Sequence, residues 1–265
     1  PGADRALPAR FTAEATGENT SGVYYRWDFN ADGTIDAEGL DRAVVTNEYT
    51  GGKWSVRLTV SNEIDEVATR LRADYIAVKA VTTYVSTQGG HQYPYASWAA
   101  AATSFQDGVP AAVSNVWVSN GAFAVSAQTV LNTGLKIRSL NGRDWTSIYR
   151  ATNSTEHRIF RMEHADAQVE GFTISNGYMT VAVAGSHGGG VWMSAGTLKD
   201  CHVTRNTGYR GAGIYLTSGR VENCWITTNT MLTGGSTEYG GGIAVDGAGA
   251  MVTGCTIVAN SARSY

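Results

Sequence analysis

The chain has 265 residues, of which 16% are charged, and its formal net charge at pH 7 is −3. The scattered charges exclude a basic surface for the phosphate backbone of nucleic acids, and no apolar run reaches the roughly 20 residues that span a bilayer. The chain contains 32 glycines and only 4 prolines, a composition that favours short strands joined by glycine turns and predicts an all-β protein.

Residues 1–79 are predicted to form a small β-sandwich. Four segments alternate apolar and polar residues with no helical stripe between them: "RFTAEATG", "VYYRWDF", "KWSVRLTVSN" and "ADYIAVKA". Roughly seven short strands in a segment of this length would suit a small immunoglobulin-like sandwich. The strand around Trp27, followed by Tyr49 and then by the strand from Trp54 to Asn62, resembles the PKD domain, an immunoglobulin-like module of bacterial secreted proteins. The resemblance implies a bacterial protein that is secreted.

The turn after the Trp27 strand carries a run of oxygen-bearing side chains. Asp28, Asn30, Asp32 and Asp36 fall two or four residues apart, as in an EF-hand loop, but Gly39 stands where that loop needs a bidentate glutamate. A strand, not a helix, precedes the loop, so we do not expect an EF-hand. Two interpretations stay open: some of these side chains hold a Ca²⁺ ion that stiffens the module, or they bond the backbone of an Asx-rich turn. No cofactor is expected to be required.

Residues 80–265 are predicted to form a right-handed parallel β-helix, with the leading strand and a capping helix in residues 80–111. In "YASWAAAATSFQDG", residues 95–108, apolar side chains from Trp98 to Phe105 fall at helical spacing. An amphipathic helix there would cover the strand edge and apolar end that the first coil of a β-helix exposes.

Three glycine-led segments in the second half repeat one another: "GGGVWMSAGTLKDCHVTRN", "GAGIYLTSGRVENCWITTN" and "GGGIAVDGAGAMVTGCTIVAN". A repeat of roughly 20–30 residues without helical periodicity predicts a solenoid in which each coil covers its neighbour. Strands about 4.8 Å apart would stack identical side chains in a cysteine column and an asparagine column. The members of these columns are Cys201, Cys224, Cys255, Asn206, Asn229 and Asn260. We interpret both columns as structural, because buried thiols pack as small apolar groups and asparagines satisfy turns.

Several segments resemble known β-helix proteins. Residues 84–109, "VWVSNGAFAV" and "LKIRSLNG" resemble the start of secreted bacterial β-helix proteins of the pectate-lyase-like superfamily. The glycine-led coils resemble the repeats of polymorphic outer-membrane proteins, which pair a GG-aliphatic motif with FxxN, although cysteine here replaces the phenylalanine. The resemblance implies the fold. It also implies what catalysis would need: acids on neighbouring coils that bind calcium in a lyase, or paired carboxylates in a hydrolase.

The aligned coils do not stack acids at one position. Two residues before the cysteine column, the charge alternates along Glu170, Lys199, Glu222 and Thr253. The best enzyme candidates are Glu163, Asp166 and Arg161, in the polar cluster "EHRIFRMEHADAQ", and the alternative is a solvated strand face. Outward-facing aromatic residues would bind sugar rings, and inward packing is their alternative; the residues concerned are Trp117, Trp145, Tyr149, Trp192, Tyr215 and Trp225.

These patterns favour a non-enzymatic structural or adhesive protein, located outside the cell or on its surface. The last residues, "CTIVANSARSY", lead toward another coil without a polar cap, so we expect a piece of a longer protein or an assembly surface. Head-to-tail contacts there would build a fibre. The expected partners are other copies of the chain or surface proteins. Two alternatives remain: a polysaccharide lyase or glycoside hydrolase of the pectate-lyase-like fold, and a carbohydrate-binding protein without turnover.

Overall fold

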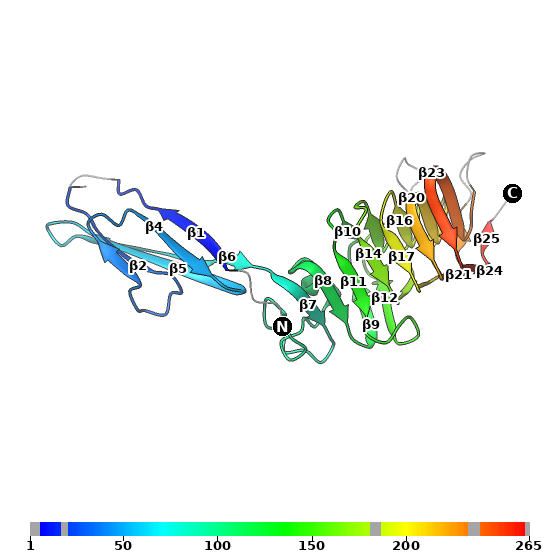
Figure 1. Ribbon diagram of the computed structural model, residues 1–265, viewed down its shortest axis with the longest axis horizontal. Helices are drawn as coiled ribbons and strands as arrows, with labels where there is room; N and C mark the ends of the chain where they lie inside the picture. The colour runs from blue at the N-terminus through cyan, green and yellow to red at the C-terminus, as the bar shows by residue number, and fades with distance from the viewer. Residues whose placement is uncertain (1–5, 17–20, 181–186, 233–238, 263–265) are drawn as a thin grey trace. The chain divides into compact units, whose positions relative to one another are not determined.

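The computed structural model describes residues 6–16, 21–180, 187–232 and 239–262 and shows an all-β protein that is 2% helical. The chain divides into two compact units, Pro1–Val81 and Thr82–Tyr265, and Figure 1 labels most of their strands. Within the described ranges, no helix is long and apolar enough to cross a membrane.

The first unit contains two antiparallel sheets. One sheet pairs β1 (Leu7–Thr12) with β4 (Val44–Tyr49). The other has the order β3 (Ala37–Gly39), β2 (Tyr24–Asp28), β5 (Gly52–Ser61) and β6 (Val67–Val78). β1 and β6 are therefore both edge strands.

Side chains from both sheets form one apolar core. Tyr25 and Trp27 of β2 are buried, because alternate side chains of a strand point to the same face. The ring of Phe11 on β1 lies 5.5 Å from the ring of Phe29. The indole nitrogen of Trp27 donates a hydrogen bond to the carbonyl oxygen of Arg42 at 2.8 Å. The two sheets thus share one aromatic core.

The second unit is a parallel β-solenoid of about six turns. One of its sheets has six strands, in which every neighbouring pair is parallel. These strands are β9 (Gly121–Val125), β12 (Thr146–Arg150), β15 (Thr173–Ser175), β18 (His202–Thr204), β21 (Trp225–Thr227) and β24 (Thr256–Val258). The same order in space and in sequence means that each coil lies on the one before it.

A ten-stranded sheet supplies two further faces of the solenoid, joined by the long strands β20 (Ile214–Glu222) and β23 (Ile243–Thr253). One face contains β7 (Ala80–Val85), β8 (Ala112–Val118), β11 (Lys136–Ser139), β14 (Gln168–Glu170) and β17 (Thr197–Lys199). The other contains β10 (Thr129–Leu131), β13 (Phe160–Met162) and β16 (Val191–Met193). A short third sheet consists of β19 (Thr207–Gly208), β22 (Thr230–Met231) and β25 (Ser261–Ala262).

The three cysteines stack along the solenoid. The main-chain N–H of Cys201 lies 3.4 Å from Sγ of Cys224, and that of Cys224 lies 3.4 Å from Sγ of Cys255. Cys201 and Cys224 are fully buried, and all three thiols are free. The hydrogen bond with Cys201, together with burial, raises the pKa of the Cys224 thiol. Cys224 is therefore a neutral thiol, and the cysteine column packs against the core of the solenoid.

The asparagines form a continuous hydrogen-bonded ladder. Oδ1 of Asn229 accepts bonds from the main-chain N–H and the side-chain amide of Asn206, both at 3.0 Å. Oδ1 of Asn260 accepts the equivalent bonds from Asn229 at 3.0 and 2.9 Å. The amide of Asn206 also donates to the carbonyl of Ile174, and that of Asn229 to the carbonyl of Val203. Each asparagine thus joins neighbouring coils through groups that would otherwise be buried without partners.

The helix predicted over residues 95–108 is limited to one turn. α1 spans only Phe105–Gly108, with Ser104 as its N-cap. The preceding residues bond to β7 instead: the N–H of Tyr84 donates to the carbonyl of Tyr95, and the N–H of Ala102 donates to the carbonyl of Tyr84, both at 2.9 Å. Backbone groups that bond to a neighbouring strand cannot also make helical bonds. The apolar spacing reflects packing on the first coil, which corrects the prediction.

Candidate functional site

The face formed by β10, β13, β16 and the first part of β20 carries a column of outward-facing residues. Arg161, Trp192 and Tyr215 pair in register on successive strands. Each lies between two sequence neighbours that are fully buried, so its own side chain points away from the core. Trp192 is half-buried, and Tyr215 is only 7% exposed. We call this column and the polar residues bonded around it the Arg–aromatic face; its members are Arg161, Glu163, Trp192, Arg210, Tyr215 and Asp246.

At one end of the Arg–aromatic face, Arg161 connects a carboxylate with an aromatic ring. Its guanidinium lies 2.7 Å from Oε1 of Glu163, and its central carbon lies 4.9 Å from the centroid of the Trp192 ring. The side chain of Arg161 is 41% exposed. Because an exposed cation–π contact contributes only about 0.5–1 kcal/mol, its main effect is to fix the orientation of the two side chains.

At the other end, Tyr215 and Arg210 share one carboxylate. The hydroxyl of Tyr215 donates to Oδ2 of Asp246 at 2.6 Å, and Arg210 lies 3.6 Å from the same oxygen. The hydrogen bond from Tyr215 holds the pKa of Asp246 below its usual value. Burial, followed by the contact with Asp246, raises the pKa of Tyr215. At neutral pH the pair is therefore a carboxylate and a neutral phenol. The ring of His187 lies 4.7 Å from that of Tyr215.

This arrangement suits a ligand with flat apolar surfaces and hydroxyl or acidic groups at its rim. Trp192 offers an aromatic plane. Arg161 and Arg210 offer several N–H donors in fixed directions, and the two carboxylates offer acceptors. Arg210 lies beside Asp246, whose lowered pKa favours its ionised form. Glu163 is paired with Arg161.

Two of the three predicted enzyme residues meet in the structure. Arg161 and Glu163 form the ion pair described above. Asp166 lies in the following turn, where its side chain is 81% exposed and its Oδ2 lies 4.0 Å from Nδ1 of His164. The neighbouring Arg158 is buried, and burial lowers its pKa to about 10, which leaves it cationic at neutral pH. The cluster therefore pairs one carboxylate with a cation, whereas glycoside hydrolysis needs two carboxylates across a cleft.

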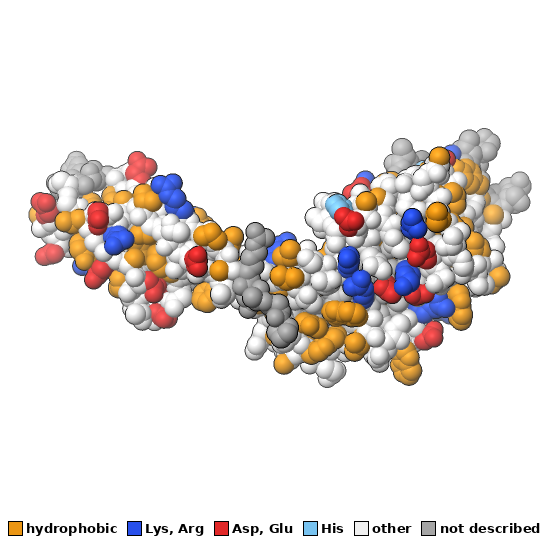
Figure 2. Space-filling model, viewed as in Figure 1, with side chains coloured by type: hydrophobic (Ala, Val, Ile, Leu, Met, Phe, Trp, Pro, Cys, Tyr) orange, Lys and Arg blue, Asp and Glu red, His pale blue; other side chains and the backbone are white. Residues whose placement is uncertain are grey.

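The charge ladder on the β11–β14–β17 face is paired between coils. Glu170 lies 3.2 Å from Arg138 and 3.3 Å from Lys199, and register places these three residues side by side. Lys199 also lies 3.6 Å from Asp200. Figure 2 shows charged side chains of both signs intermixed on the visible face of the solenoid. Such pairing joins neighbouring coils, and positive and negative side chains alternate along this ladder.

The turn with the predicted calcium ligands is bonded to its own backbone. Oδ1 of Asp28 accepts from the N–H of Asp32 at 3.2 Å, and Oδ2 accepts from the N–H of Gly33 at 2.9 Å. Asp28 is buried, and Nη1 of Arg57 lies 3.3 Å from its Oδ2. Oδ2 of Asp36 accepts a main-chain N–H at 2.6 Å. These bonds occupy carboxylate oxygens that a metal ion would need.

Asn30 and Asp32 complete the turn. The amide of Asn30 donates to Oδ2 of Asp32 at 2.9 Å, and Oδ1 of Asp32 accepts from the N–H of Thr34 at 2.7 Å. The bond from Thr34 lowers the pKa of Asp32. Among the residues that the structure describes, no group of three or more histidine, cysteine, aspartate or glutamate side chains is placed to hold a metal. The turn contains the bonds of an Asx-rich turn, and calcium binding stays a prediction for titration.

Part of the Arg–aromatic face could be predicted from the amino-acid sequence. Trp192 and Tyr215 were candidate outward aromatics, and each stands two residues after a glycine-led triplet, GGG and GAG respectively, which indicates that they share one column. Arg210 and Asp246 were missed. Asp246 is 31 residues from Tyr215, and the two meet only because β20 pairs with β23.

Comparison of the chain with profiles of known families, with curated proteins and with solved structures finds no match. The chemistry of the site is therefore the basis for a functional assignment.

Proposed function

We propose that this chain is an adhesive element of a secreted or cell-surface protein, whose solenoid binds a polysaccharide on the Arg–aromatic face without cleaving it. In this proposal the first unit is a PKD-like, immunoglobulin-like sandwich, which its two sheets and shared aromatic core support. The solenoid is assigned as a right-handed β-helix of the pectate-lyase-like superfamily, with coils like those of polymorphic outer-membrane proteins. Its parallel register and glycine-led coils support this assignment.

The observation that carries the proposal is the column of Arg161, Trp192 and Tyr215 in successive coils. An aromatic plane packs against the C–H face of a sugar ring, while the flanking guanidinium and carboxylate groups bond its hydroxyls. Successive strands lie about 4.8 Å apart, so a polymer that lies along the solenoid axis meets a new coil at that spacing. A linear polysaccharide is thus a better match than a small ligand.

Binding without turnover is supported by the partners of the two carboxylates. A glycosidase needs a carboxylic acid whose raised pKa keeps its proton at neutral pH. The pKa of Asp246 is instead lowered by its bond with Tyr215, and Glu163 lies 2.7 Å from the guanidinium of Arg161. Asp246 therefore acts as a hydrogen-bond acceptor, and the carboxyl group of Glu163 is paired with a cation rather than with a second carboxyl group.

The proposal is tested by affinity electrophoresis of the full chain in gels that contain neutral or uronate-bearing polysaccharides. We expect retardation by at least one polysaccharide, and Trp192→Ala should weaken it by roughly tenfold or more, as truncation of a central tryptophan does. Trp145→Ala is the matched control, since Trp145 is 64% exposed and lies outside the Arg–aromatic face.

The same mixtures are followed for unsaturated products by absorbance and for new reducing ends. Product formation that is lost in Glu163→Gln would replace this proposal with the lyase or hydrolase alternative. Equal retardation of wild type and Trp192→Ala would show that the Arg–aromatic face is not the binding site.

A further inference from the structure

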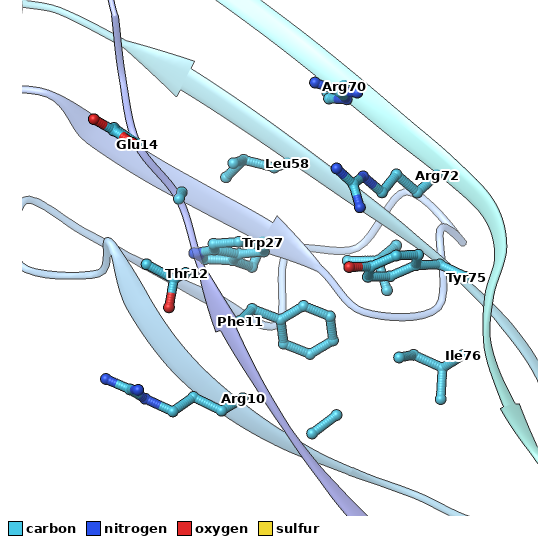
Figure 3. A pocket seen from close by; sticks show the side chains of 13 residues that line it. Arg10, Phe11, Thr12, Glu14, Trp27, Leu58, Arg70, Arg72, Tyr75 and Ile76 are labelled. Atoms are coloured by element: carbon cyan, nitrogen blue, oxygen red, sulfur yellow. The ribbon is translucent and has the colours of Figure 1, made fainter.

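The first unit contains a cleft between the edge strands of its two sheets. Among the residues described, β1 pairs only with β4, and β6 pairs only with β5. Each edge strand therefore presents one row of main-chain donors and acceptors that no described strand occupies. The cleft between them has a volume of about 570 Å³. Figure 3 shows Phe11 and Trp27 inside it, with Arg72 and Tyr75 on the β6 side.

The register of β6 turns two arginines toward this cleft. Residues directly opposite each other on antiparallel strands have their side chains on the same face. Arg72 lies opposite Val56, which is buried, and Arg70 lies opposite Leu58, which packs on the core. Both arginines therefore point between the sheets, where apolar side chains would be expected. Leu71 points to the outside and is 52% exposed.

The floor of the cleft is aromatic. Phe11 and Trp27 are 7% and 4% exposed, and both belong to the core as well as to the cleft wall. The guanidinium carbon of Arg72 lies 4.7 Å from the centroid of the Tyr75 ring, which holds this side chain at the rim. A ligand in the cleft would thus meet apolar surface below and cations at one side.

The charged groups of the cleft are unbalanced. They are Arg10, Arg70, Arg72 and Glu14, so positive charge is in excess. None of these arginines forms a salt bridge with any residue in the described part of the chain. The cleft is therefore complementary to an anionic partner.

We propose that β6 binds an extended acidic segment of a partner protein as an added β-strand, with carboxylates at alternate positions facing Arg70 and Arg72. Strand addition satisfies the free edge of β6 through main-chain bonds, and side chains two residues apart on the added strand fall on one face. The residue between the two acids lies beside exposed Leu71, so an apolar residue suits that position. The recognised pattern is acid–apolar–acid.

The length of the added strand follows from an irregularity in β6. The pairing of β5 with β6 shifts register between Trp54 and Val56, and Asp74 adopts a φ of 49° there. The regular part of β6 is therefore residues 67–72, and the bulge that follows bends the strand. A partner segment of about six residues matches this part.

A purely protective role is the competing explanation. Inward-pointing charges and bulges on an edge strand also prevent unwanted pairing with other sheets. In that case Arg70 and Arg72 would repel every added strand alike, because burying either guanidinium without a counter-charge is costly. The two explanations differ in whether an acidic strand binds.

The test uses the full chain and a fluorescein-labelled peptide of about eight residues in which glutamate alternates with valine. Binding is measured by fluorescence anisotropy, beside the same peptide with lysine in place of glutamate. We expect the glutamate peptide to bind and the lysine peptide to bind at least about tenfold more weakly. The double substitution Arg70→Glu and Arg72→Glu should reverse this preference. Arg42 is exposed and lies outside the cleft, so the control variant Arg42→Glu should keep the preference for the glutamate peptide.

Two further measurements separate strand addition from other binding. Methylation of alternate main-chain nitrogens in the peptide should abolish binding, and bound peptide should slow hydrogen exchange of β6 amides. Equal affinity for both peptides, an unchanged preference in the double variant, or full binding of the methylated peptide would overturn the proposal. Self-association of the chain that the double variant abolishes would assign the cleft to a second copy and also overturn it.

Discussion

Replacing Asn229 with alanine should destabilise the solenoid by about 3–5 kcal/mol. The side chain of Asn229 takes part in four hydrogen bonds: two accepted from Asn206, one donated to the carbonyl of Val203 and one donated to Asn260. Asn229 is fully buried. Each such bond contributes about 1 kcal/mol net, and a buried group left without a partner costs about 1–3 kcal/mol. The main-chain N–H of Asn206 loses its acceptor in this variant.

Urea unfolding followed by circular dichroism measures the loss, and hydrogen exchange of amides in β18 and β21 locates it. Asn141→Ala is the control: its amide also bonds an asparagine, Asn120, at 2.8 Å, but the pair is exposed. That variant should change stability by no more than about 0.5 kcal/mol. A stability of Asn229→Ala within about 0.5 kcal/mol of wild type would show that the asparagine ladder does not hold the coils together.

Three further predictions concern single side chains. A calcium ion in the turn after β2 would raise the melting temperature, and Asp32→Ala would remove that increase. A melting temperature that is unchanged by added calcium would contradict the prediction. The thiol of Cys224 is buried and its pKa is raised, so it should be alkylated far more slowly in the native chain than in the unfolded chain. Mass spectrometry measures the two rates, and rapid labelling of the native chain would contradict the prediction. Burial lowers the pKa of His202 from 6.5, so its contribution to stability is complete above pH 6.5 and is lost as the pH falls through its folded pKa. The free energy of unfolding, measured in urea, should therefore fall less in His202→Gln than in wild type between about pH 7 and pH 5. The same fall in both proteins would contradict the prediction.

The solenoid was predictable because its geometry is periodic. Coils that stack in register need similar path lengths, so equivalent positions recur along the chain. The three cysteines stand at one position of the glycine-led repeat, and the structure stacks them. Alternation of apolar and polar residues likewise indicated strands outside residues 95–108.

The segment before α1 shows where local patterns fail. Apolar residues from Trp98 to Phe105 have helical spacing, yet the backbone of this segment bonds to β7. Spacing reports which side chains face the core, but it does not report whether main-chain groups bond within the segment or to a neighbouring strand.

The candidate sites depend on pairings between distant residues. Asp246 reaches Tyr215 through the register of β23 on β20, and Arg57 reaches Asp28 through the pairing of β5 with β2. Whether Arg70 faces the core or solvent depends on the register of β6, because a shift of one residue moves every side chain to the other face. The amino-acid sequence alone determined the repeating architecture, through local alternation and the recurrence of glycine-led segments. Only the tertiary structure decided which polar side chains meet, because that depends on strand register and loop paths that no local pattern encodes.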